Sequence, residues 1–186
     1  TDLFARLLGV DADGLAGLAL AAGPSEGPVL VAHLDGERKP DLPDARGLLS
    51  GITSATTREE IARAAHEGVL LGLIAGLQHL DRLGVDTSGR MLIVGGASRS
   101  RAYRQLLADL VQRRVLVPDP VDADEASARG ACIQAAAVAA GSDVREVRDA
   151  WRPEVVTAIE PRTPLRDPRE SYARAAALNA EFHSAR

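Results

Sequence analysis

Short apolar runs alternate with longer helical patterns along this chain of 186 residues. The segment VLVAH at 29–33 is apolar and rich in β-branched residues, and Pro28 and Gly36 bound it, which predicts a strand. RMLIV at 90–94 and RVLVP at 114–118 follow the same pattern, and prolines stop the latter. The chain therefore predicts several short strands separated by longer segments.

The clearest helix start lies in TTREEIARAAHEG. A threonine and the glutamate three residues later form a capping box, as Thr56 with Glu59 or as Thr57 with Glu60. The helix is expected to run to about Leu83, with the glycine that follows as its stop.

Three more helices are predicted, beginning near Ser100, covering 122–141, and following Asp167 as cap. Residues 1–28 hold two short helical patterns and end in turn residues, which predicts a connector. Residues 29–186 then form the domain. Its order of strand, long helix, strand, helix, strand, helix is typical of an α/β fold with a sheet flanked by helices.

The middle of the long helix is unusual. From Gly68 to Leu77 it is apolar on every side, which predicts burial. Gly68, Gly72 and Gly76 form one stripe, and we expect close contact with a sheet or another helix to offset their low helix propensity. Glu67 precedes this stretch, and a structural hydrogen bond inside the protein is favoured over a catalytic role.

Composition narrows the possible functions. Hydrophobic residues make up 46% of the chain and aromatics 3%, with a net charge of -4, so no basic surface or stacking platform for nucleic acid is expected. Cys132 is the one cysteine, which excludes an internal disulfide; it lies among alanines and is interpreted as a small core residue. No apolar run reaches the length of a membrane span, so a cytoplasmic protein without a membrane partner is expected. The opening TDLFARLL suggests a piece of a longer polypeptide.

The most suggestive local feature is MLIVGGASRS at 91–100, where a predicted strand meets a helix. Gly95 and Gly96 would let backbone N–H groups approach a phosphate, although a plain tight connection explains the glycines equally well. The chain contains neither G-x-x-x-x-G-K-[ST] nor G-x-G-x-x-G. The four histidines show no paired metal-ligand spacing, so no metal site is predicted.

Four stretches in this order resemble the C-terminal half of the FGGY carbohydrate kinases: HLDGERKPDLPDARG, IARAAHEGVLLGL, LIVGGASRSRAYRQLLADL and RVLVPDPVDADEASARGACIQAAAVAAG. Several motifs in one order are more specific than any of them alone. The resemblance spans roughly residues 29–185 and, within the family, is closest to the xylulokinases. It implies a ribonuclease H-like domain of the actin-like ATPase superfamily, lacking its first strands.

The resemblance also implies a nucleotide-binding site at the glycine turn. Gly95 and Gly96 would let the backbone approach the nucleotide, Ala97 and Ser98 would complete the turn, and Ser100 would lie where the next helix meets it. Ala97 stands where many members have a third glycine, which implies a slightly less close approach.

Two further motifs match. Residues 36–38 fit the G-E-R-x-P loop, which is interpreted as shaping the interdomain region. Glu125, Ala128 and Gly130 belong to the small-residue pattern E-x-x-A-x-G-A beside the turn, where Arg129 replaces a frequent leucine and implies a more exposed face.

The implied activity is transfer of phosphate from ATP, with Mg²⁺ bound through the nucleotide, to D-xylulose. The catalytic aspartate and the sugar site are expected upstream, so no catalytic residue is assigned here and this segment alone is expected to be inactive. Two alternatives stay open: an FGGY kinase for ribulose, gluconate or a polyol, and a non-catalytic actin-like nucleotide-binding module. A homodimer is compatible with either.

Overall fold

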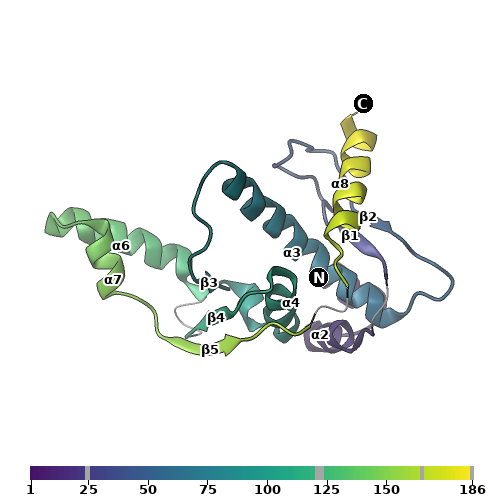
Figure 1. The fold of residues 1–186 in the computed structure, drawn as a ribbon, viewed down its shortest axis with the longest axis horizontal. Helices are drawn as coiled ribbons and strands as arrows, with labels where there is room; N and C mark the ends of the chain where they lie inside the picture. Colours follow the sequence, from purple (N-terminus) through teal and green to yellow (C-terminus); the bar gives the residue numbers. More distant parts are fainter. Residues whose placement is uncertain (24–25, 120–123, 164–165, 185–186) are drawn as a thin grey trace.

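The computed structural model describes residues 1–23, 26–119, 124–163 and 166–184. They form a mixed α/β structure in which helices pack against two small sheets (Figure 1). None of the helices in these ranges combines the length and the apolar content that crossing a membrane requires.

The elements agree with the predicted order and add several that the pattern did not indicate. The helices are α1 (Asp2–Leu8), α2 (Ala12–Ala21), α3 (Arg58–Arg82), α4 (Arg101–Val111), α6 (Ala126–Ala140), α7 (Val144–Ala150) and α8 (Arg169–Ser184), with a 3-10 helix η1 (Gly96–Arg99). The strands are β1 (Val29–Val31), β2 (Leu48–Ser50), β3 (Met91–Leu92), β4 (Val115–Pro118) and β5 (Val155–Ile159).

The two sheets differ in topology. Strands β1 and β2 pair antiparallel, with Val29 opposite Ser50. In the second sheet β4 lies between β3, which is parallel to it, and β5, which is antiparallel, and the register shifts at Pro118. A proline has no N–H to give to the ladder, which accounts for the irregularity at that position.

The start and end of α3 lie where the sequence predicts them. Thr57 is the N-cap: its side chain accepts from the Glu60 N–H at 3.2 Å, and Glu60 Oε2 accepts from the Thr57 N–H at 2.8 Å. Of the two capping boxes considered, the structure therefore contains the second. Gly84 follows the C-cap with φ +82°, a conformation that favours glycine.

The glycine stripe and the apolar middle of α3 match expectation at one end. A Cβ at Gly68 would lie 2.4 Å from the Leu30 carbonyl oxygen, so α3 touches β1 there without room for a side chain. A Cβ at Gly76 would meet nothing within 4 Å, and Leu73 is 67% exposed. The prediction that the whole stretch is buried is therefore wrong, because the helix extends beyond the elements that cover it.

The main core lies where α2, α3, α4 and β1 meet, and its largest fully buried side chains include Leu15 and Val31. Residues of α1 and α2 belong to this core: Phe4, Leu15, Ala16 and Ala19. Helix α8 packs along β1 on the side of the molecule opposite α6 and α7 (Figure 1). The division of the chain at residue 28 stays a prediction.

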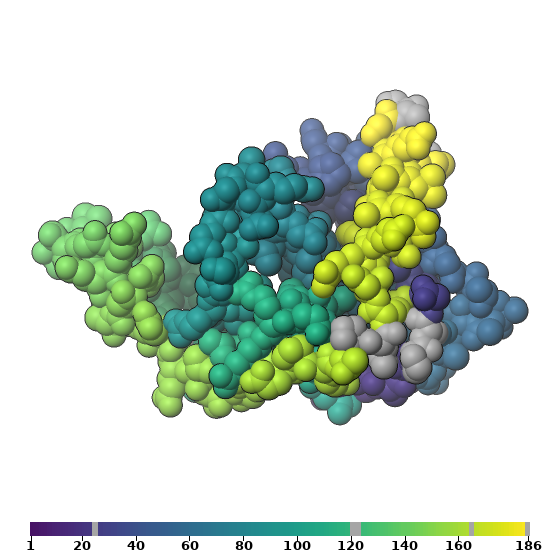
Figure 2. Space-filling view, in the orientation of Figure 1, coloured from purple at the N-terminus to yellow at the C-terminus, as the bar shows by residue number. Residues whose placement is uncertain are grey.

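Helices α6 and α7 extend away from the rest of the molecule as an arm, which Figure 2 shows in green. Of the α6 residues only Ala137 is buried. Cys132 is exposed, so its interpretation as a core residue is wrong. The alanines around it favour a helix, but this propensity does not determine whether another element packs on the helix. The start predicted for this helix at 122 lies outside the described residues.

Candidate functional site

The glycine turn lies directly after the second sheet and before α4. Gly95 has φ +76° and ψ -170°, a combination that essentially only glycine adopts. The chain then enters η1, in which the Ser98 N–H donates to the Gly95 carbonyl at 2.9 Å. A residue with a side chain would be strained at this position, so the geometry requires the first of the two glycines.

Open space lies over the turn. A Cβ at Gly95 or at Gly96 would meet no atom within 4 Å, although Gly96 is not held at positive φ. The first N–H groups of such a helix have no acceptor within it, so those of Gly96 and Ala97 are available as donors. Gly96 and Ala97 are both exposed, so the bare backbone faces outward.

Ser98 and Ser100 connect the turn to α4 through hydrogen bonds. Ser98 is 3% exposed, and its carbonyl accepts a hydrogen bond from the Arg104 guanidinium. Ser100 is the N-cap of α4: its hydroxyl accepts from the Tyr103 N–H at 3.4 Å. The five residues expected to form a site thus lie in one short segment, with Gly96, Ala97 and Ser100 at a cavity.

That cavity has a volume of about 440 Å³ and lies between the turn, α3 and the first two helices. His66 and Tyr103 line it, and both are buried. Burial lowers the pKa of His66 and raises the pKa of Tyr103. Asp2 of α1 and Asp13 of α2 line the same cavity.

An ion pair joins the turn to the arm. The Arg99 guanidinium binds the Asp124 carboxylate, with 3.2 Å between Nε and Oδ1. Asp124 lies two residues before α6, so the start of the small-residue helix is held beside the glycine turn, as the sequence motif implies. Arg129, in contrast, donates to the Trp151 carbonyl and ties α6 to α7.

Sequence reasoning did not identify His66, Tyr103, Arg99 or Asp124 as parts of the site. His66 and Tyr103 lie at helical spacing among apolar residues, which is the pattern of an ordinary core. Arg99 and Asp124 are 25 positions apart in the chain, so no local sequence pattern predicts their ion pair.

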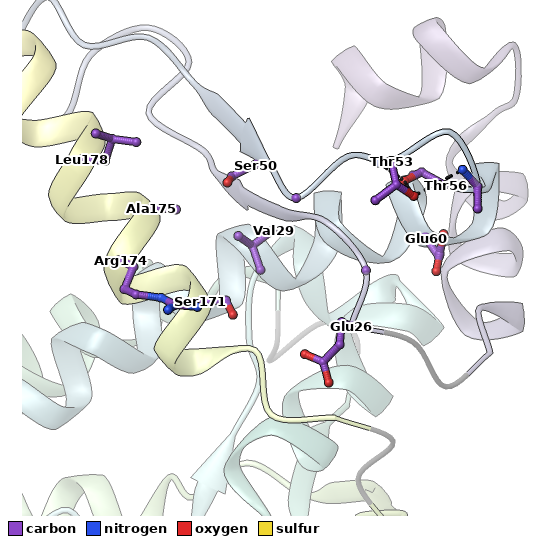
Figure 3. Close-up of a pocket in the computed structure, with 13 residues that line it drawn as sticks. Glu26, Val29, Ser50, Thr53, Thr56, Glu60, Ser171, Arg174, Ala175 and Leu178 are labelled. Atoms are coloured by element: carbon purple, nitrogen blue, oxygen red, sulfur yellow. Dashed lines mark hydrogen bonds between the residues drawn. The ribbon is translucent and has the colours of Figure 1, made fainter.

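A larger cavity, of about 690 Å³, lies elsewhere, between the ends of β1 and β2, the start of α3 and α8 (Figure 3). Its polar lining consists largely of hydroxyl groups, with Glu26, Glu60 and Arg174. Glu60 is engaged in the capping box and Arg174 lies on the exposed side of α8, so the cavity gathers no buried charged group. It holds none of the residues that the sequence analysis placed in a functional site.

The conformation of the G-E-R-x-P loop depends on its glycine. Gly36 has φ +92°, and a Cβ there would lie 2.3 Å from the Pro43 carbonyl oxygen. Glu37 and Leu42 exchange backbone hydrogen bonds of 2.9 and 2.8 Å, which close the loop. Within the described ranges, no three histidine, cysteine or carboxylate side chains gather where they could hold a metal ion.

Comparison with protein families gives one match over most of the chain. The model for the FGGY family of carbohydrate kinases, C-terminal domain, matches residues 10–139. A xylulose kinase of Streptomyces rubiginosus is 37% identical over 150 residues, which cover 81% of this chain and 29% of that protein. A gluconokinase of Bacillus subtilis is 36% identical over 132 residues, which cover 69% of this chain and 25% of that protein.

Solved structures agree with these matches. The xylulose kinase from Bifidobacterium adolescentis has a TM-score of 0.75 at 37% sequence identity, and the match covers 94% of this chain and 33% of that one. The chain thus spans about a third or less of the length of these relatives.

Proposed function

The chain belongs to the FGGY family of carbohydrate kinases, and from this we propose that it supplies the ATP-binding surface of a kinase that phosphorylates D-xylulose. Its fold is the α/β, actin-like ATPase fold of those sugar kinases, as expected. Because the chain spans a minor share of its relatives, the proposal assigns it nucleotide binding and no catalytic residue.

One observation carries the placement of the nucleotide: Gly95 and Gly96 present bare backbone to open space beside a cavity of about 440 Å³. N–H groups at such a turn suit an anionic or ribose oxygen, because no side chain stands between donor and ligand. ATP would supply the phosphoryl group, and Mg²⁺ would enter with it. Ser98 and Ser100 hold the turn in place for this contact.

D-xylulose as substrate is supported by the two xylulose kinases, each 37% identical to this chain. Gluconate is the second candidate, because a gluconokinase is 36% identical. A non-catalytic nucleotide-binding module is the remaining alternative.

A direct assay decides among these. The full natural polypeptide that contains this chain is given ATP, Mg²⁺ and a panel of xylulose, ribulose, gluconate and glycerol. We expect the highest kcat/KM with D-xylulose, and no turnover by the 186-residue chain alone. A higher kcat/KM with gluconate would identify gluconate as the substrate in place of D-xylulose. If no sugar is phosphorylated, the non-catalytic nucleotide-binding module is favoured.

A second experiment tests the position of the nucleotide. Gly96→Val places a side chain in the open space, and the residue is not held at positive φ, so the fold tolerates the change. Gly89→Val is the matched control, since a Cβ at Gly89 also meets nothing within 4 Å. We expect the Kd for ATP to rise at least tenfold in the first variant and to stay unchanged in the second. Unchanged ATP affinity in Gly96→Val would show that the nucleotide binds elsewhere.

A further inference from the structure

A cavity of about 300 Å³ lies between α3, α4 and the segment that follows β5. Three arginines line it, Arg63, Arg162 and Arg166, together with the carboxylates of Glu67 and Asp109. It shares no lining residue with the cavity at the glycine turn. Five charged side chains thus line one small cavity, and burial of an ionised group is unfavourable unless it has a partner.

Two of the arginines bind the carboxylates of the cavity. Arg166 Nη2 lies 2.5 Å from Glu67 Oε2, and the same guanidinium donates to the Gly27 carbonyl at 3.1 Å. Arg162 holds Asp109 with two hydrogen bonds, from Nη2 at 2.6 Å and from Nε at 3.0 Å. Each carboxylate of the cavity is therefore matched to one guanidinium.

Arg63 is the third cation and has no carboxylate of its own. It is 5% exposed, and its Nε donates to the Ala19 carbonyl at 3.3 Å. Its nearest carboxylate oxygen, Glu67 Oε1, lies 4.0 Å away and belongs to the carboxylate bound by Arg166. In the described part of the chain, neither Nη group of Arg63 makes a hydrogen bond to the protein.

The net charge of the cavity lining is consequently positive, by one. Burial lowers the pKa of Arg63, yet an arginine stays charged at neutral pH. Arg63 shares the single Glu67 carboxylate with Arg166, so its charge is incompletely balanced, and a guanidinium offers paired N–H groups that fit two oxygens of one acceptor. The missing partner thus has the chemistry of a small oxyanion.

We propose that this cavity is a binding site for a small oxyanion, a phosphate group or a carboxylate, which accepts hydrogen bonds from the two Nη groups of Arg63. The half-exposed Arg162 and Thr163 line the same cavity and add donors. Its volume accommodates a phosphate group or a small molecule that carries one. The site does not depend on where ATP binds.

The test uses the full natural polypeptide, saturated with a non-hydrolysable ATP analogue so that the nucleotide site is filled. Inorganic phosphate, ribose 5-phosphate and acetate are titrated separately by calorimetry. Saturable binding of at least one of them is expected: tighter phosphate than acetate identifies a phosphate group, the reverse identifies a carboxylate, and tighter ribose 5-phosphate identifies a monoester. No saturable binding by any of the three would overturn the proposal.

Variants locate the site. Arg63→Gln is expected to weaken the binding at least tenfold, whereas Arg114→Gln, with the same change of charge on a half-exposed side chain paired to Glu160, is expected to leave it unchanged. Asp109→Asn removes a competing carboxylate and is expected to tighten binding severalfold, a gain that a misfolded variant would not show. Equal affinity in Arg63→Gln and the unchanged protein, or weaker binding in Asp109→Asn, would refute the assignment.

Discussion

The imidazole of His66 meets the ring of Tyr103 edge-on, with ring centroids 4.8 Å apart and planes inclined at 62°. His66 Nδ1 also lies 2.9 Å from the Ala62 carbonyl oxygen, and the side chain is 2% exposed. The contact joins α3 to α4 directly beside the glycine turn. It uses the neutral imidazole, because a second proton would have to be placed in the core without a partner.

A pH dependence of stability follows from this contact. Burial lowers the pKa of His66 below 6.5, so the unfolded chain binds more protons at acidic pH and stability falls as the pH drops through 6.5. In His66→Phe, which keeps an aromatic ring, the loss of unfolding free energy between pH 7.5 and pH 5.5 is expected to be smaller. Denaturant unfolding at the two pH values measures it, with the exposed His79→Phe as control. The prediction is contradicted if His66→Phe loses as much unfolding free energy between the two pH values as the unchanged protein does.

The glycine stripe of α3 gives a pair of opposite predictions. Gly68→Ala forces a Cβ to within 2.4 Å of the Leu30 carbonyl, and we expect a loss of about 1–3 kcal/mol in the free energy of unfolding. Gly76→Ala meets nothing and gains helix propensity, so it is expected to stabilise by up to about 1 kcal/mol. Chemical denaturation measures both, and equal effects would show that α3 does not approach β1 as described.

The turn gives a second matched pair. Gly95→Ala is expected to lower the unfolding free energy by about 1–3 kcal/mol, because alanine is strained at φ +76° and ψ -170°. Gly96→Ala is expected to change it little, since neither conformation nor space opposes the methyl group. Equal stability of the two variants in thermal and denaturant unfolding would argue against the turn as described.

Buried and exposed ion pairs are expected to respond differently. Glu67→Gln leaves Arg63 and Arg166 buried without a counter-charge, and a loss of about 3–5 kcal/mol is expected. Glu160→Gln breaks the exposed pair with Arg114 and is expected to cost below about 1 kcal/mol. Equilibrium unfolding compares the two, and a similar small loss in both would mean that the Glu67 pair is solvated in solution.

Features encoded within one turn of the chain were predictable from the sequence. The capping box at Thr57, the glycine stop at Gly84 and the Ser100 cap depend on residues three or four positions apart, and all three are present. The structural interpretation of Glu67 also holds, because an ionised group in an apolar helix must find a partner wherever it lies.

Features that depend on distant contacts were not predictable. Strand β2 has three residues, and the five residues of β5 stand between polar segments that contain prolines; each strand is fixed by pairing with a strand that is distant in the sequence. The same holds for exposure: Leu73 and Cys132 lie in apolar helical patterns, but nothing in those patterns states whether another element covers them. Likewise, the partner of Glu67 is Arg166, and no local sequence pattern connects two residues that lie 99 positions apart.

The separation of Glu67 and Arg166 along the chain affects when α3 can finish folding during synthesis. Arg166 follows Glu67 by 99 positions, so α3 emerges from the ribosome long before the guanidinium that neutralises its buried carboxylate has been translated. Until then Arg63, one turn away, screens that charge. The nascent helix is therefore expected to complete its docking on β1 late, when residue 166 leaves the exit tunnel and fastens the loop at 26–28 in the same step.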